Sequence, residues 1–188
     1  MAKRLTQPSA EPVLLADVKA QLNIRDTIQD AIITRRIKEA REWCEEFMQR
    51  ALLSSSWKVM LDGFVDGIEL AYPPIISVTS IKYYDTNGVQ QTLVNTAYSL
   101  DSYSEPGIVN RVYGTDWPDT RDIPNAVEVI YDAGYASVGD IPYPIIEAIM
   151  LLVGHWMNNQ GAAETGTVIT RVPLAVEQLL QPYRILRY

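Results

Sequence analysis

Two strongly apolar helical patterns, residues 28–51 and 144–158, stand on either side of residues 56–142, where apolar residues alternate as they do in strands. A helix with so much apolar surface is stable in water only when another element covers it. We therefore expect the two helices to pack together although they are far apart in the sequence. The β region is then an insert between them, and the order of elements predicts an α+β fold with a discontinuous helical core.

The first long helix carries one continuous apolar stripe. Its members recur at alternating intervals of four and three residues, as on one face of an amphipathic helix; they are Ile33, Ile37, Ala40, Cys44, Phe47 and Ala51. Asp26-Thr27 predicts the N-cap. Opposite charges four residues apart, among them Arg41 and Glu45, are expected on a solvated or rim face. A shorter helix, residues 14–22, precedes this one.

The second long helix is apolar on nearly all sides, and such a helix needs cover from several neighbours. Pro144 suits its first turn, and residues 158–161 end it. One side is expected to face the 28–51 helix, and another side a neighbouring subunit. The candidate interface residues on this helix are Ile146, Met150, Val153 and Trp156. A short helix, residues 174–180, completes the predicted helical core.

From residue 56 onward the apolar residues follow a period of two, which predicts strands. Asp62-Gly63 is a turn signal between a strand at 56–61 and a returning strand at 68–71. A second hairpin turns at Asp85–Gly88, and further strands are expected at 98–100, 108–113 and 126–132.

The chain is therefore expected to divide into two parts. The helical part comprises residues 1–55 and 143–188, and the inserted antiparallel β lobe comprises residues 56–142.

Composition restricts the possible partners. The net charge of −7 argues against tight binding of nucleic acid, because phosphates need clustered Lys and Arg. Cys44 is the only cysteine, so an internal disulfide is impossible and folding in a reducing compartment is expected. The N-terminal residues lack the apolar stretch of a signal peptide, and no apolar run reaches the ~20 residues that span a bilayer. We expect cytosolic synthesis and no membrane partner.

Catalytic chemistry is poorly represented. His155 is the only histidine and Cys44 lies on an apolar helix stripe, so a catalytic triad or a zinc site lacks suitable residues. The acidic clusters are interpreted as turns and solvated loops; they are Asp62, Asp66 and Glu69 in one segment and Asp116, Asp119 and Asp122 in another. We predict no enzyme activity, no cofactor and no metal site.

Many segments, in order along nearly the whole chain, resemble the head–tail connector family of tailed phages, also called head-completion or adaptor proteins. They are residues 40–52, 56–57, 61–64, 73–81 with the Tyr-Tyr-Asp hairpin at 83–85, 104–107, 117–118, 133–135, 144–146, 151–156, 176–180 and 182–184. Relatives often carry Thr-Gly where this chain has Met48-Gln49, so its first long helix is expected to run on at this point.

The resemblance implies a structural virion protein of the head–tail neck, assembled in the cytoplasm of a bacterial host. It implies a homo-oligomeric, dodecameric ring beneath the portal protein that extends the DNA channel. The ring would offer a docking surface to the next neck or tail protein, and DNA would pass through it without tight or specific binding. The alternatives are a stopper or tail-terminator protein of the neck, a phage-encoded hydrolase, and a small terminase subunit that packages DNA.

Residues 159–173 are expected to be mobile in the free subunit and ordered in the assembled neck. This segment leads from Gly161 and two alanines to Thr167, Val168 and Ile169, which favour strands. Such a segment can add a strand to the sheet edge of another subunit, and folding back on its own domain is the equally supported alternative. Tyr183 and Arg184 complete the candidate interface residues.

Overall fold

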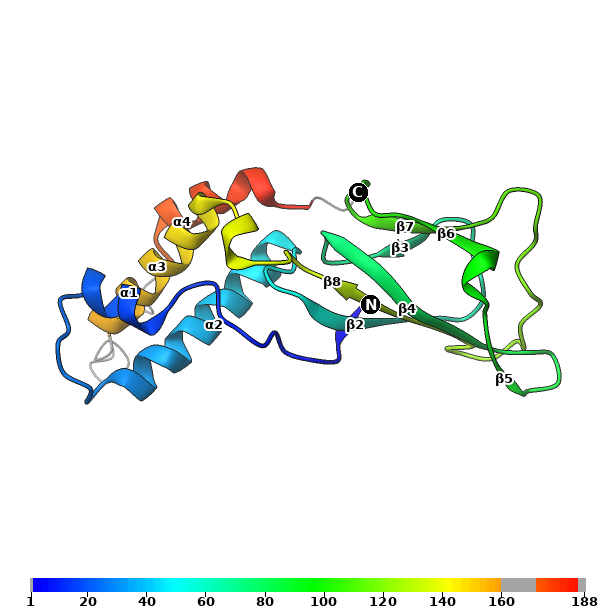
Figure 1. Cartoon of the computed structure of the whole chain (residues 1–188), viewed down its shortest axis with the longest axis horizontal. Coiled ribbons are helices and arrows are strands. Elements are labelled where there is room, and N and C mark those ends of the chain that lie inside the picture. Colours follow the sequence, from blue (N-terminus) through cyan, green and yellow to red (C-terminus); the bar gives the residue numbers. More distant parts are fainter. Residues whose placement is uncertain (1, 160–171, 186–188) are drawn as a thin grey trace. The chain divides into compact units, whose positions relative to one another are not determined.

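The computed structural model describes residues 2–159 and 172–185, and the chain divides into two units (Figure 1). The β unit comprises residues 1–9 and 53–135, and the helical unit comprises residues 10–52 and 136–188. The chain is thus α+β, as the sequence predicts. The sequence interpretation grouped the N-terminal residues with the helices, whereas in the structure Lys3 and Arg4 pair with a strand of the β unit.

A five-stranded antiparallel sheet, in the order β1-β2-β8-β4-β5, forms the larger layer of the β unit. Its strands are β1 (Lys3–Arg4), β2 (Ser55–Leu61), β4 (Ile75–Tyr84), β5 (Gln90–Thr92) and β8 (Val127–Ala133). Buried and half-buried side chains alternate along β2 and β8, and the register places Trp57 opposite Tyr131 and Val59 opposite Val129. The period-two pattern of the sequence therefore corresponds to one covered face of this sheet.

A second, three-stranded sheet has the order β3-β7-β6. It consists of β3 (Ile68–Leu70), β6 (Tyr98–Asp101), which follows a short 3-10 turn at Asn95–Ala97, and β7 (Gly107–Arg111). The predicted hairpin between 56–61 and 68–71 is wrong, because β3 pairs with β7 and not with β2. Both edges of β2 are already occupied, one by β1 and the other by β8.

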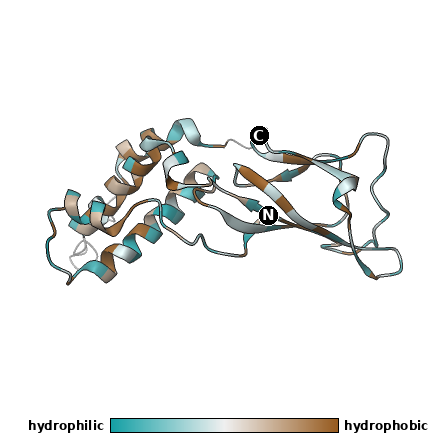
Figure 2. Cartoon of the chain, viewed as in Figure 1, coloured by the Kyte–Doolittle hydropathy of each residue, from teal (hydrophilic) through white to brown (hydrophobic). Residues whose placement is uncertain are grey.

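In the helical unit, α2 (Asp30–Met48) packs against α3 (Tyr143–Asn158), and α3 also contacts α4 (Leu174–Leu180). Helix α1 (Leu15–Gln21) lies against both α2 and α3, and 3-10 turns at Val138–Asp140 and Gln181–Tyr183 precede α3 and follow α4. The core is apolar (Figure 2) and includes Ile33, Ile37, Cys44, Ile149 and Leu152. Among the described residues, none of the helices is both long and apolar enough to cross a membrane.

Both ends of α2 differ from the sequence prediction. Asp26 does not cap the helix; its Oδ1 accepts the Ile28 backbone N–H at 3.0 Å, and α2 begins later, at Asp30. The helix ends at Met48 and does not run on, because Gln49 adopts the left-handed conformation with φ 56°. The Gln49 side-chain amide donates to the Glu46 carbonyl at 2.9 Å, a bond that stabilises this C-cap without a glycine.

Candidate partner-binding surfaces

Three loops of the β unit meet at one end of the five-stranded sheet. The register places Val127, the first residue of β8, opposite Leu61 at the end of β2 and opposite Tyr83 near the end of β4. Residues 62–67, 85–89 and 112–126 therefore lie together, and we call them the loop end. The chain connects to the helical unit at the opposite end of the sheet, where Ser55 pairs with Ala133.

The long loop of the loop end is held by both of its neighbours. The Trp117 ring stacks on Phe64 with centroids 4.8 Å apart and planes 5° from parallel. The Asn125 backbone N–H donates to Asp62 Oδ1 at 2.8 Å, and the Arg121 backbone N–H donates to the Tyr84 carbonyl at 3.0 Å. Because these contacts come from β2, β4 and their loops, the loop end is pre-formed in the single chain.

The carboxylate of Asp85 organises the β4–β5 hairpin. Its Oδ1 accepts the backbone N–H groups of Asn87 and Val89 at 2.9 and 3.0 Å, and its Oδ2 accepts the Gln91 side-chain amide at 2.9 Å. The hydrogen bond from Gln91, followed by the bond from Val89, lowers the pKa of Asp85 below its ordinary value. Asp85 therefore acts as a turn residue.

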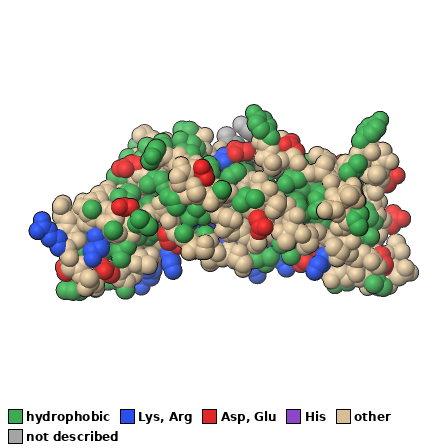
Figure 3. Space-filling model, in the orientation of Figure 1, with side chains coloured by type: hydrophobic (Ala, Val, Ile, Leu, Met, Phe, Trp, Pro, Cys, Tyr) green, Lys and Arg blue, Asp and Glu red, His purple; other side chains and the backbone are tan. Residues whose placement is uncertain are grey.

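Acidic side chains predominate at the loop end, as Figure 3 shows along the right-hand end of the molecule. The acidic residues are Asp62, Asp66, Asp85, Asp116, Asp119 and Asp122, and the only basic residue is Arg121; Arg111 lies next to the loop end, as the last residue of β7. Arg111 Nε lies 3.0 Å from Asp66 Oδ1, and its Nη1 lies 3.1 Å from Asp116 Oδ1. Within residues 2–159 and 172–185, no three His, Cys, Asp or Glu side chains are placed to hold a metal ion.

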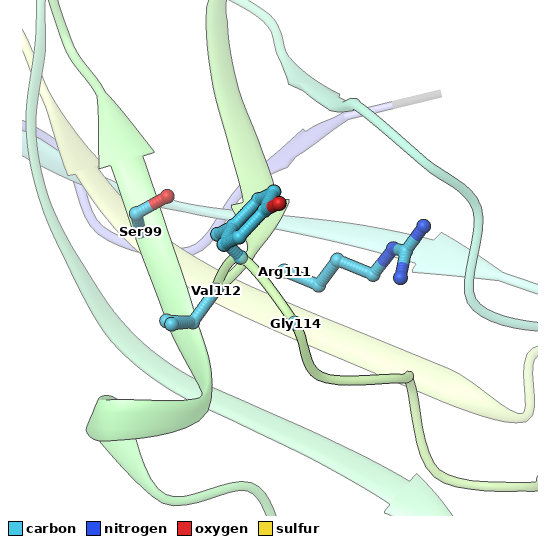
Figure 4. A pocket seen from close by; sticks show the side chains of 5 residues that line it. Ser99, Arg111, Val112 and Gly114 are labelled. Carbon is cyan, nitrogen blue, oxygen red and sulfur yellow. The ribbon is translucent and has the colours of Figure 1, made fainter.

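A hollow of about 430 Å³ lies beside β6 and the end of β7. Its lining residues are Ser99, Arg111, Val112, Tyr113 and Gly114. Figure 4 shows that the Arg111 guanidinium points away from Ser99, toward the neighbouring loop, and its Nη1 also donates to the Thr115 carbonyl at 2.7 Å. Because the Arg111 guanidinium binds Asp66, Asp116 and the Thr115 carbonyl, it holds two loops of the loop end together.

The helical unit presents a partly exposed apolar strip on α3. Tyr143 is 87% exposed, and Ile146, Met150 and Leu151 are half-buried. At 100° per residue these positions span one arc of the helix, which also contains the exposed Glu147, on the side away from the buried Ile149 and Leu152. We call Tyr143, Ile146, Met150 and Leu151 the α3 strip.

The other predicted interface residues have intramolecular contacts. Val153 is fully buried in the helical core, and the Arg36 guanidinium lies 5.8 Å from the Trp156 ring centroid. The Tyr183 carbonyl accepts a hydrogen bond from Arg50 Nε at 3.3 Å. Arg184 lies over the Phe47 ring at 5.2 Å. The predicted strand-forming residues Thr167, Val168 and Ile169 lie outside the described residues.

Cys44 and His155, the two residue types that could act as a nucleophile or a base, have surroundings typical of residues that only support the fold. Cys44 is fully buried, and burial, aided by the Glu45 charge, raises the pKa of its thiol to about 12. The His155 carbonyl accepts the Asn159 side-chain amide at 2.7 Å. Among the described residues, His155 forms no ion pair with a carboxylate, so the geometry of a catalytic triad is not present there.

One charged pair was assigned wrongly from sequence. Arg41 and Glu45 were expected on a solvated face, but they are 2% and 3% exposed. The missed signal is their position: each directly follows a member of the buried stripe, Ala40 or Cys44, so the covered face of α2 is wider than one residue.

The family comparison covers α1, α2 and the strands from β2 to β6. Residues 13–104 match the phage gp6-like head-tail connector proteins. This connector family is a structural class and not an enzyme class, in agreement with the sequence prediction. No curated protein sequence matches the chain.

Solved structures extend the similarity to the whole chain. A chain in the neck of a native gene transfer agent (GTA) particle, computed with C12 symmetry, is 22% identical with a TM-score of 0.76. Chains in the neck of an empty GTA particle, computed with C6 symmetry, and in the virion of the native particle are each 21% identical with TM-scores of 0.75. Each comparison covers 100% of this chain and 97% of the other. The chain therefore has the fold of these proteins from end to end.

Proposed function

We propose that this chain is the head–tail connector, or adaptor, of a virion neck. In this role it forms an oligomeric ring of twelve copies below the portal protein, extends the DNA channel and presents a docking surface to the next neck or tail protein. It is made and assembled in the cytoplasm of a bacterial host. The observation that carries the proposal is the connector-family match over residues 13–104 on a chain whose whole fold is that of proteins in GTA particles.

Helix α3 supplies the surface that suits contact between subunits. The α3 strip combines one aromatic and three aliphatic or thioether side chains, a composition that is enriched in the cores of protein interfaces. In a ring, the strip of one copy contacts a different surface of the next copy, because ring interfaces are heterologous. Ile146 and Met150, predicted as interface residues, belong to this strip.

Charge suits a channel that DNA crosses without binding. The chain has a net charge of −7, so a ring of twelve copies would carry about −84. Such a field repels the phosphate backbone, and tight binding would need clustered cations. Part of this negative charge is concentrated at the loop end of the β unit, which carries six Asp side chains and one Arg side chain.

A matched pair of substitutions tests this role for α3. Met150→Glu places a charge in the α3 strip, and Leu174→Glu places the same charge at an apolar position on α4 that is 67% exposed. Each variant is mixed with purified portal protein of the same virus, and rings are counted by electron microscopy after circular dichroism has verified folding. We expect rings with wild type and Leu174→Glu but not with Met150→Glu. Rings of normal abundance with a folded Met150→Glu would show that the strip is not the subunit contact.

A further inference from the structure

Among the described residues of the helical unit, Arg41 and Glu45 are the most heavily buried charged side chains. Arg41 Nη1 lies 2.7 Å from Glu45 Oε2, and Arg41 Nε donates to Glu11 Oε2 at 2.8 Å. Glu45 uses its other oxygen, Oε1, to accept the Leu52 backbone N–H at 2.9 Å. Three segments of the helical unit are thus joined through two side chains of one helix.

Two of these segments lie where the chain passes from one unit to the other. The helical unit begins at Ala10, and its first part ends at Leu52. Glu11 is therefore the second residue of the helical unit, and Leu52 is the last residue before the chain enters the β unit. Residues 10–13 and 49–52, which we call the junction segments, are both tied to the last two turns of α2 through Arg41 and Glu45.

The charges of this cluster compensate one another. Burial opposes the charge of Arg41, but the carboxylates of Glu45 and Glu11 outweigh that effect and raise the pKa of the guanidinium above its ordinary value. Removing one partner leaves an uncompensated buried charge, whereas replacing a buried ion pair by apolar residues of similar volume often leaves stability unchanged or raised. The distinguishing feature of this ion pair is therefore its geometry, which joins two other chain segments to α2.

We propose that Arg41 and Glu45 form a latch that holds the two junction segments in fixed positions on the helical unit. With the latch closed, the chain leaves the helical unit from defined points. With the latch removed, residues 10–13 and 49–52 become mobile while the helical core stays intact. This inference does not depend on the proposed place of the chain in a virion.

The double variant Arg41→Met/Glu45→Leu tests the latch, because it removes both charges and retains side chains that fill the core. Amide hydrogen exchange is measured in the full chain, at the junction segments and along α3. We expect exchange at Leu52 to accelerate about tenfold or more, as for the loss of a hydrogen bond to a charged acceptor, and exchange at residues 10–13 to rise. The α3 amides should retain their protection. Unchanged exchange in the junction segments, or equal acceleration along α3, would overturn the proposal.

Two single variants complete the test. Glu11→Gln loosens only residues 10–13 if the latch exists, and it is tolerated more readily because the Glu11 side chain is 21% exposed. Glu42→Gln is the control: Glu42 Oε1 lies 3.5 Å from Arg41 Nη2, but its side chain is 53% exposed, and among the described residues it forms no hydrogen bond or ion pair with either junction segment. If Glu11→Gln and Glu42→Gln give the same exchange pattern, the latch is refuted even if the double variant does not fold.

Discussion

Phe64 and Trp117 come from different loops and stack with ring centroids 4.8 Å apart. Phe64 also makes an edge contact with Tyr83 of β4 at 5.5 Å. A short loop, a strand and a long loop thus share one aromatic cluster. This cluster keeps residues 112–126, which contain no helix or strand, in a defined position on the sheet.

Replacing Trp117 by Ala should destabilise the β unit by about 2 kcal/mol, below the ~3–5 kcal/mol of a fully buried aromatic because Trp117 is only half-buried. Urea denaturation followed by circular dichroism measures the change. The matched control is Tyr113→Ala, since Tyr113 lies in the same loop and is fully exposed; its effect should stay within about 0.5 kcal/mol. Equal effects of the two substitutions would contradict the role given to the aromatic cluster.

Replacing Leu152 by Ala should cost about 2–5 kcal/mol, because this side chain is fully buried in the helical core. Leu174→Ala, at a 67% exposed position on α4, should change the free energy of unfolding by less than about 0.5 kcal/mol. Thermal and chemical denaturation measure both variants. A small effect at Leu152 would show that α3 is not packed as described.

The interiors of the helices could be predicted from sequence because their periodicity reports which side chains are buried. The ends of α2 could not. Gln49 takes a left-handed conformation that is usual for glycine, and a side-chain hydrogen bond to the Glu46 carbonyl supports it. A local pattern carries no signal for such a cap.

The sequence pattern also does not identify strand partners that lie far apart in the chain. The segment 68–70 has the composition of a strand, but its partner β7 lies beyond β4, β5 and β6 in the chain, and the nearest strand was chosen instead. The spacing of Arg41 and Glu45 likewise fits an exposed pair and a buried pair equally well. Their positions next to Ala40 and Cys44 were the only local signal of burial, and their partners Glu11 and Leu52 lie 30 residues before Arg41 and seven after Glu45.

The predicted interface residues on α3 remain a prediction, and the structure shows which of them are accessible in the single chain. An α3 sequence that is apolar nearly all round does not say which face its neighbours cover, so Val153 was expected at an interface although it is buried. Tyr143, which is 87% exposed, was not among the predicted interface residues because it precedes the regular apolar pattern of the helix. The loop end could not be assembled before the register of β2, β4 and β8 was known.

Cys44 should be unreactive toward thiol reagents in the native protein. Burial raises the pKa of its thiol to about 12, so only about one molecule in ten thousand carries the thiolate at pH 8. A colorimetric disulfide reagent should label Cys44 at the rate of unfolding, and rapidly in urea. Fast, stoichiometric labelling of the folded chain would contradict this environment.

The same pKa shift has a consequence for stability. The unfolded thiol ionises above about pH 8.5, whereas the native thiol stays protonated until near its raised pKa. This contribution to stability is therefore complete below about pH 8.5 and is lost as the pH rises toward 12. Cys44→Ala should show a smaller loss of stability between pH 8 and pH 10 than wild type.

Asp101 should make stability sensitive to acid. Hydrogen bonds from the Ser104 hydroxyl, the Ser104 backbone and the Tyr103 backbone lower its pKa. The folded carboxylate therefore adds stability above the unfolded pKa of about 3.9, and this stability is lost as the pH falls through the lower folded pKa. The difference in Tm between wild type and Asp101→Asn should be largest near neutral pH and should shrink in acid. Ser104→Ala should remove part of the pH dependence of Tm, because the Ser104 hydroxyl donates one of these hydrogen bonds. Identical pH profiles of Tm for wild type, Asp101→Asn and Ser104→Ala would contradict this role of Asp101.

The central claim is that this chain forms the connector ring of a virion neck. The most direct measurement is cryo-electron microscopy of the neck of particles produced by the genome that encodes the chain. We predict a ring of twelve copies with the fold described here, directly below the portal, with the α3 strip buried between neighbouring copies. Absence of the chain from the neck, or its density at another level of the particle, would contradict the account.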